Sequence, residues 1–121
     1  MEAERFLTAP AAAPGARDRL ARVTMMQETV ARAWNVPLAE LRSPTRRKAP
    51  VAQARQVAMY FTHVLYGFSL SAVGRHFGRD RTTAAHACRT VEDRRDDRNF
   101  DMLLDRLEQA LRCAGEGSRP Q

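Results

Sequence analysis

The 121-residue sequence contains one lysine, two cysteines and no long apolar run, and each shortage excludes a class of protein. A phosphate-binding P-loop needs Gly-Lys-Ser/Thr, but Lys48 lies between Arg47 and Ala49, which excludes a Walker-type nucleotide site. Cys88 and Cys113 are too few for a disulfide scaffold or a zinc site. No stretch approaches the roughly 18–20 apolar residues that cross a bilayer, and the N-terminus does not resemble a signal peptide. We therefore expect a cytoplasmic protein with free thiols, no metal, no cofactor, no small-molecule substrate and no membrane contact.

The 20 basic residues outnumber the 14 acidic ones, and the excess is concentrated in the middle of the chain. Residues 41–90 hold nine basic side chains and one acidic side chain, Asp80. Residues 1–40 hold five of each kind, and residues 91–121 hold six basic and eight acidic side chains. A central block with a net charge of +8 is typical of a protein that binds a polyanion such as nucleic acid. Charge alone leaves open the alternative of a solvated basic surface without a ligand.

Hydrophobic spacing predicts one all-α domain of five to six helices over residues 17–113. Apolar residues recur with a helical period in segments 17–34, 51–66 and 98–113, and a short helix is predicted over 37–41. No segment alternates with the period of a strand. Residues 1–16 are expected to form a flexible arm, residues 43–50 a basic loop bounded by prolines, and residues 114–121 a flexible tail.

Residues 69–91 have the pattern of a helix-turn-helix motif. Ser69 is a candidate N-cap for a short helix, Gly78 interrupts the chain, and Asp80 is a candidate N-cap for the helix that follows. Small side chains at helical spacing predict the core side of this second helix: Ala84, Ala87, Cys88 and Val91. The opposite side carries Arg81, Thr82, Thr83, His86, Arg89 and Thr90. Hydrogen-bond donors and methyl groups of these kinds match base edges in the major groove, which makes duplex DNA the leading ligand.

Several separated blocks of the sequence match one known domain in order. The blocks are Ala54-Arg55-Gln56-Val57-Ala58-Met59-Tyr60, then Ser69-Leu70, then residues 73–83 (Val-Gly-Arg-His-Phe-Gly-Arg-Asp-Arg-Thr-Thr), then His86-Ala87-Cys88-Arg89 with Val91-Glu92. Over roughly residues 25–97 the chain resembles the C-terminal DNA-binding domain of the bacterial replication initiator DnaA. The resemblance implies a helix-turn-helix fold related to the Trp repressor, bound to a short asymmetric duplex site.

The resemblance also implies a role for individual positions. In the basic loop, Arg47 matches an arginine that enters the minor groove, and Arg46 and Lys48 flank it. Arg55 and Gln56 match residues that hold phosphates. The other positions of the implied DNA-binding set are Leu70 and Ser71 beside the DNA backbone, Asp80, Thr82, Thr83 and His86 as base-reading residues, and Arg79, Arg81 and Arg89 around them. No catalytic residue is implied.

The sequence departs from the family pattern near the turn of the motif. Arg81 stands where the family has histidine, and one glycine is missing before Arg79. Ser71 stands where proline is common in the family, and Thr90 where lysine is common. We therefore expect the bound sequence to be related to the DNA site of the family but distinct from it.

Three classes of function compete. Because the 121 residues contain no ATPase motif, we expect a DNA-binding unit that acts without ATP. Short free-standing proteins that resemble this domain include transcription regulators, among them activators of gene-transfer-agent clusters, so we predict a transcription regulator that acts as an activator. The alternative is a replication regulator that occupies DnaA-box-like sites at the origin without remodelling them. An enzyme such as a nuclease is disfavoured, because the basic block has only one carboxylate, Asp80.

The C-terminal part of the chain is expected to face away from DNA. Asp101, Asp105 and Glu108 are predicted to form an acidic outer side of the last helix, which phosphate groups would repel, and residues 92–98 are predicted to be a solvated helix end. This end of the protein, or the N-terminal arm, is the expected contact for another transcription factor or an RNA polymerase component.

Overall fold

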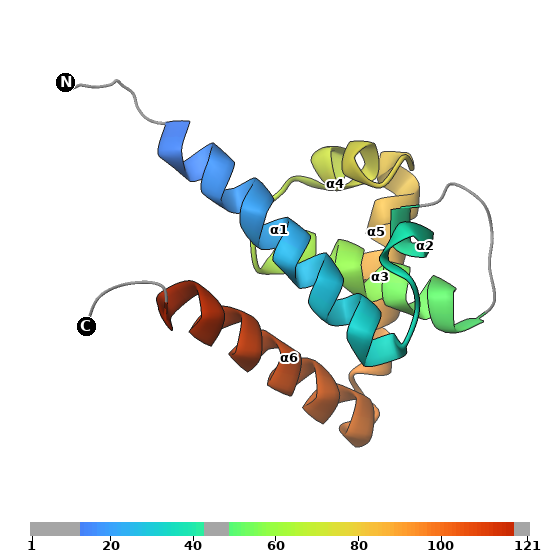
Figure 1. The fold of residues 1–121 in the computed structure, drawn as a ribbon. Helices are drawn as coiled ribbons and strands as arrows, with labels where there is room; N and C mark the ends of the chain where they lie inside the picture. The colour runs from blue at the N-terminus through green and yellow to red at the C-terminus, as the bar shows by residue number, and fades with distance from the viewer. Residues whose placement is uncertain (1–12, 43–48, 118–121) are drawn as a thin grey trace.

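Six α-helices account for most of the chain in the computed structural model, which describes residues 13–42 and 49–117 (Figure 1). They are α1 (Ala13–Trp34), α2 (Leu38–Arg42), α3 (Ala49–Val64), α4 (Leu70–His76), α5 (Arg81–Arg94) and α6 (Arg98–Gly117). The described residues contain no strand, so the predicted all-α fold of five to six helices is confirmed. None of the helices in this part of the chain is long and apolar enough to cross a membrane.

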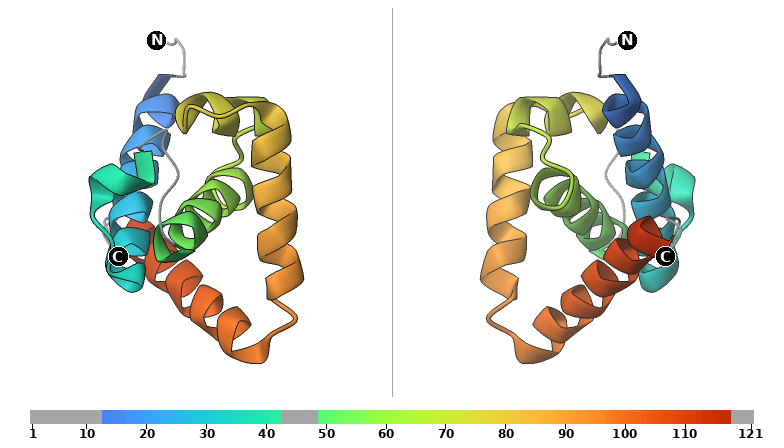
Figure 2. Two further views of the ribbon diagram at one scale, coloured as in Figure 1. Left: turned by 90° about the vertical axis from the view of Figure 1, so that its right-hand side faces the viewer. Right: turned by 90° about the vertical axis from the view of Figure 1, so that its left-hand side faces the viewer.

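The helices are arranged around α3. In the left-hand view of Figure 2, α3 lies between α1 and α5. In the same view, α4 lies above α3 and α6 lies below it. α6 returns alongside α1 in the opposite chain direction (Figure 1). This arrangement leaves α3, α4 and α5 together at one side of the molecule, and these helices, with the turn between α4 and α5, carry those predicted DNA-binding positions that the structure describes.

The apolar residues that recur at helical spacing in the predicted segments are mostly buried. They include Val23, Met26 and Val30 of α1, Ala54, Ala58 and Phe61 of α3, Val73 of α4 with Phe77, and Phe100, Leu104 and Leu111 of α6. Leu20 with 52% exposure and Leu103 with 36% exposure are exceptions, as are the exposed Ala33 and Ala110. Gln27 is fully buried although it is polar, and its amide lies 3.2 Å from Nε2 of His76, which supplies the hydrogen bond that a buried amide requires.

Three predicted boundaries need correction. α1 begins at Ala13 and α6 ends at Gly117, so residues 13–16 and 114–117 are helical rather than arm and tail. α3 begins at Ala49, so residues 49 and 50 of the predicted loop are helical, because proline is accepted in the first turn of a helix. Alanine has the best helix propensity and proline is accepted in the first helical turn, which explains why Ala13 and Pro14 can start α1. The predictions for residues 1–12 and 118–121 lie outside the described residues, as does most of the predicted basic loop.

Candidate nucleic-acid interface

α4, the turn at residues 77–80 and α5 form the predicted helix-turn-helix. Ser69 caps α4, because its Oγ accepts a hydrogen bond from the backbone N–H of Ala72 at 3.1 Å. Gly78 has a φ of +68°, a left-handed conformation that glycine adopts without strain, so one glycine is sufficient for this turn. The predicted cap of α4 and the predicted break between the two helices are therefore confirmed.

The two helices come into very close contact at Gly74 of α4. A Cβ atom on Gly74 would lie 2.7 Å from the carbonyl oxygen of Arg79 and 2.9 Å from that of Asp80. In its absence the backbone N–H of Arg79 donates to the carbonyl oxygen of Gly74 at 2.7 Å. The missing side chain thus sets how near the start of α5 lies to α4.

Asp80 caps α5 as predicted. Its Oδ1 accepts a hydrogen bond from the backbone N–H of Thr83 at 2.7 Å. Hydrogen bonds from the backbone and the hydroxyl of Thr83 hold the pKa of the Asp80 carboxyl below its usual value. Asp80 is exposed to solvent, so an ionised acceptor stands at the start of α5 beside the first exposed side chains of the helix.

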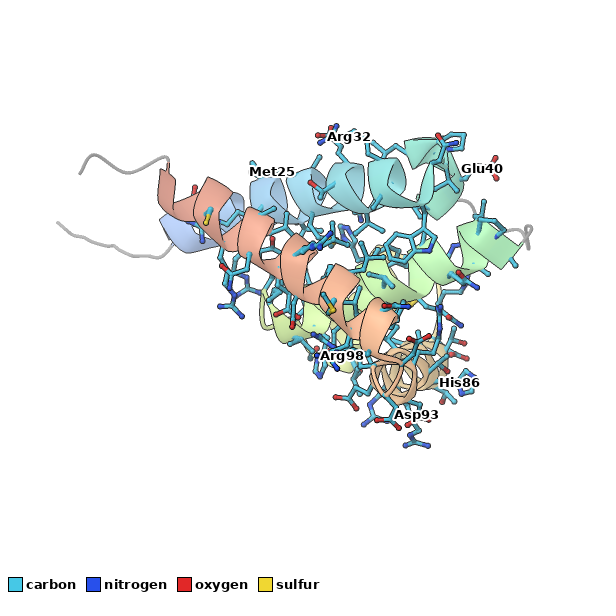
Figure 3. All side chains as sticks on the ribbon, turned by 90° about the horizontal axis from the view of Figure 1, so that it is seen from below. Met25, Arg32, Glu40, His86, Asp93 and Arg98 are labelled. Atoms are coloured by element: carbon cyan, nitrogen blue, oxygen red, sulfur yellow. The ribbon has the colours of Figure 1, made fainter. Side chains whose placement is uncertain are left out.

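The two sides of α5 differ as the spacing predicts. Ala84, Ala87, Cys88 and Val91 are buried against the core. Burial, with a smaller contribution from Glu92, raises the pKa of the Cys88 thiol to about 11, which fits an apolar filling role. The exposed residues of the other side are Arg81, Thr82, Thr83, His86 and Arg89, and Thr90 is half-buried. Figure 3 places His86 and Asp93 of α5 on the opposite side of the molecule from Arg32 of α1.

A shallow hollow of about 140 Å³ between α3 and α5 joins two groups of predicted DNA-binding residues. Its walls are Ala52, Arg55, Gln56 and Met59 of α3, Arg79 of the turn, and Thr83, His86 and Ala87 of α5. The positions assigned to phosphates therefore lie next to positions assigned to bases.

Arg55 has a structural role that the sequence interpretation missed. The residue is only 6% exposed, and its Nε and Nη2 donate to the carbonyl oxygens of Leu41 (3.2 Å) and Glu40 (2.7 Å). These carbonyls lie at the C-terminal end of α2, where unpaired backbone oxygens attract a positive charge. Arg55 thus attaches α2 to α3, and its assignment to a phosphate stays a prediction. Its spacing from Val51 and Ala58, which share the buried side of α3, is the signal that indicates this burial.

Two further predicted residues, Leu70 and Ser71, lie outside the hollow. Leu70 is half-buried and Ser71 is exposed in the first turn of α4, where neither contributes to its walls. Arg79 is half-buried, and its Nη1 donates to the carbonyl oxygen of Phe77 at 3.4 Å. Arg46, Arg47 and Lys48 lie outside the described residues, so the minor-groove assignment stays a prediction. Within the described part of the chain, no three His, Cys, Asp or Glu side chains form a group that could hold a metal ion.

The end of α5 corrects the expectations for the C-terminal part of the chain. Nε, Nη2 and Nη1 of Arg95 donate to carboxylate oxygens of Asp101 (2.5 Å), Asp105 (2.6 Å) and Glu108 (2.8 Å), and Nη1 also donates to the hydroxyl of Tyr60 (3.2 Å). These five residues are called the Arg95 cluster below. The three acidic residues of α6 therefore face Arg95 instead of forming a free outer side, and residues 92–98 are more than a solvated helix end. The i, i+4, i+7 spacing of Asp101, Asp105 and Glu108 places them on one side of a helix, and this spacing was the signal available in the sequence.

An all-α core that presents a capped second helix with an exposed polar side is typical of the helix-turn-helix class of DNA-binding proteins. A family model described as "Bacterial dnaA protein helix-turn-helix" matches residues 23–91, and the chain belongs to this family. The match begins in α1 and ends in α5. It confirms the resemblance to the DnaA C-terminal domain and supports binding to double-stranded DNA.

Two curated relatives illustrate the extent of the similarity. The chain is 47% identical over 73 residues to the chromosomal replication initiator protein DnaA of Mesorhizobium japonicum, an overlap that covers 60% of this chain and 15% of the relative. It is 39% identical over 77 residues to the protein of the same name from Rickettsia bellii, which covers 63% of this chain and 16% of the relative. The chain thus spans about one sixth of the length of these relatives.

Proposed function

We propose that this protein is a transcription regulator that binds a short duplex DNA site in a sequence-specific manner, and that it activates a gene-transfer-agent or phage-like gene cluster. The observation that carries the DNA-binding part is the exposed side of α5, where Arg81, Thr82 and His86 extend outward at the start of a helix fixed by the Asp80 cap. In this proposal the protein works at the nucleoid in the cytoplasm, together with another transcription factor or an RNA polymerase component.

α5 enters the major groove with its N-terminal turn nearest to the bases, as the second helix of such motifs does. The side chains of Thr82, Thr83 and His86 then reach base edges, and Arg81 offers a planar pair of donors to O6 and N7 of a guanine. Residues of α3 and α4 contact the phosphates on either side of the groove. The basic loop follows the adjacent minor groove through Arg47, with Arg46 and Lys48 beside it.

Mapping of genomic occupancy tests the proposal. The full chain, carrying an epitope tag, is crosslinked to DNA in its own cells, and transcripts are measured with and without the protein. We expect occupancy at a small set of promoters whose transcripts fall when the protein is removed. Arg81→Ala is expected to lose this occupancy, and the matched control Arg106→Ala, an exposed arginine of α6, is expected to keep it. Occupancy without any change in transcription would contradict the regulatory role.

The second candidate is a replication regulator that occupies DnaA-box-like sites at the origin. The observation that favours it is the similarity to two proteins whose names are those of chromosomal replication initiators. Occupancy confined to the origin in the same experiment would support this candidate over transcriptional activation.

The proposal also holds that the protein has no enzymatic activity of its own. Incubation of duplex and single-stranded DNA with the purified chain and magnesium is expected to leave both substrates intact. Cleavage that persists through purification and disappears in a variant of one described carboxylate would contradict this part.

A further inference from the structure

The two ends of α5 are held by different kinds of contact. At the N-terminal end, the Asp80 cap and the close approach at Gly74 fix the helix to α4. At the C-terminal end, the side chain of Arg95 joins α5 to Tyr60 of α3 and to three carboxylates of α6. Arg94 adds a second link to α6, because its guanidinium lies 4.0 Å from the ring centre of Phe100.

The middle of α5 packs closely against α3 and α4. Its buried side consists of the small side chains Ala84, Ala87, Cys88 and Val91, which let the helices approach one another. None of these four residues has a polar group with a fixed direction except the thiol of Cys88. The directional side-chain contacts of α5 with α6 lie beyond its last turn, at Arg95.

The Arg95 cluster is suited to hold that end. The Arg95 side chain is 18% exposed, as is that of Glu108, so this pair is shielded from solvent more than an ordinary surface ion pair. Burial lowers the pKa of Arg95, but hydrogen bonds to Glu108, Asp101 and Tyr60 together raise it above its usual value, so the guanidinium stays charged. A planar guanidinium with several aligned acceptors fixes direction as well as distance.

We propose that Arg95 is a positioning residue for sequence recognition, which holds α5 at the angle that base contacts require by joining its C-terminal end to α3 and α6. This role rests on the proposed function, because it concerns the same DNA-binding helix. Hydrogen bonds to bases are lost when a donor moves by less than 1 Å, since a contact of about 3.6 Å no longer counts as one. Attraction to phosphates is long-ranged and tolerates such a displacement. A misplaced α5 thus loses discrimination between sequences while it keeps non-specific binding.

The test compares binding of the full chain to its preferred duplex and to a scrambled duplex of equal length, with the preferred duplex selected by the wild-type protein. Arg95→Met removes the centre of the cluster, and Arg95→Lys keeps the charge without the planar set of donors. Tyr60→Phe removes only the hydroxyl that joins Arg95 to α3 and keeps the ring in the core. Arg106→Met is the control, because Arg106 is an exposed arginine of α6 outside the cluster. Circular dichroism verifies that each variant is folded at the assay temperature.

We expect Arg95→Met to lower the ratio of specific to non-specific affinity by about tenfold or more, the loss of roughly one good base contact. The affinity for the scrambled duplex and its dependence on salt stay unchanged. Arg95→Lys and Tyr60→Phe are expected to give smaller losses of the ratio, and Arg106→Met none.

A merely structural role gives a different result. Partial unfolding lowers both affinities in proportion and leaves their ratio intact, and this result in the folded variants would overturn the proposal. If Arg95→Met does not fold, an unchanged ratio in Tyr60→Phe and Arg95→Lys overturns it equally. A wild-type ratio near one would instead refute the proposed function, and the positioning role with it.

Discussion

The close approach at Gly74 allows a quantitative prediction for Gly74→Ala. The new Cβ would lie 2.7 Å from the carbonyl oxygen of Arg79, whereas ordinary van der Waals contact begins at 3.4 Å. The atoms it meets are backbone atoms of residues 79 and 80, so relief requires the start of α5 to move away from α4 by several tenths of an ångström. This displacement also strains the 2.7 Å hydrogen bond from the N–H of Arg79 to the carbonyl oxygen of residue 74.

The expected magnitude follows from two opposed terms. The clash is with backbone atoms that cannot rotate away, so the cost lies in the upper part of the range for overpacking, about 2–3 kcal/mol in free energy of unfolding, and the better helix propensity of alanine returns about 0.8–1 kcal/mol. A net loss of about 1–2 kcal/mol corresponds to a Tm lower by roughly 4–10 °C for a domain of this size. Because the displaced element is the start of α5, specific DNA affinity should fall further than the loss of folded protein explains.

Thermal unfolding followed by circular dichroism, together with anisotropy titrations of a labelled duplex, measures both effects. Gly67→Ala is the matched control, because a Cβ at Gly67 meets nothing within 4 Å and the cost comes only from the φ of +74°. We expect Gly67→Ala to lower the Tm without a separate effect on DNA binding. A Gly74→Ala variant with wild-type Tm and wild-type DNA affinity would show that the described contact between α4 and α5 is wrong.

Four further predictions follow from the charge, the exposed side of α5 and the thiols. With about 5–7 phosphate contacts, a plot of the logarithm of the DNA-binding constant against the logarithm of the salt concentration should have a slope near −4 to −6. A slope near zero in a series of anisotropy titrations would contradict the electrostatic role of residues 41–90. Arg47→Ala should weaken binding most where A·T pairs flank the site, since a narrow minor groove attracts arginine; equal affinity for the best site would remove Arg47 from the interface. Arg81→His should relax the choice of one guanine, worth about 1–3 kcal/mol, and shift preference toward the DnaA box, whereas an unchanged consensus in a selection experiment would assign Arg81 to a phosphate. A maleimide should label Cys113, which is exposed, and leave Cys88 unlabelled at neutral pH, because Cys88 is buried and its pKa is raised to about 11; mass spectrometry that finds two labels on the native chain would refute this.

The helices and the exposed side of α5 are predictable because their signals are local. Apolar spacing identifies the buried side of α5, and the short distance from Asp80 to Thr83 identifies its cap, since both depend only on residues within one or two turns. Helix ends are less certain: the start of α1 at Ala13 rests on a balance of propensities that composition alone does not resolve.

The contacts between elements were not predictable in the same way. Arg55 lies on the buried side of α3, but its partners are carbonyls of α2, which only the packed structure identifies. Asp101, Asp105 and Glu108 share one side of α6, and such a series is usually solvated, so the position of Arg95 across the turn was needed to interpret it. The same is true of Gly74: a glycine inside a helix can indicate a close contact, but the sequence does not identify the residues that it contacts.

Selection of binding sites from a pool of random duplexes by the purified full chain, at physiological salt, is the measurement that tests sequence recognition by α5 most directly. The account predicts one short enriched consensus, bound at least about 10³-fold more tightly than a scrambled duplex. A pool that stays random after repeated selection, with equal affinity for all duplexes, would contradict it.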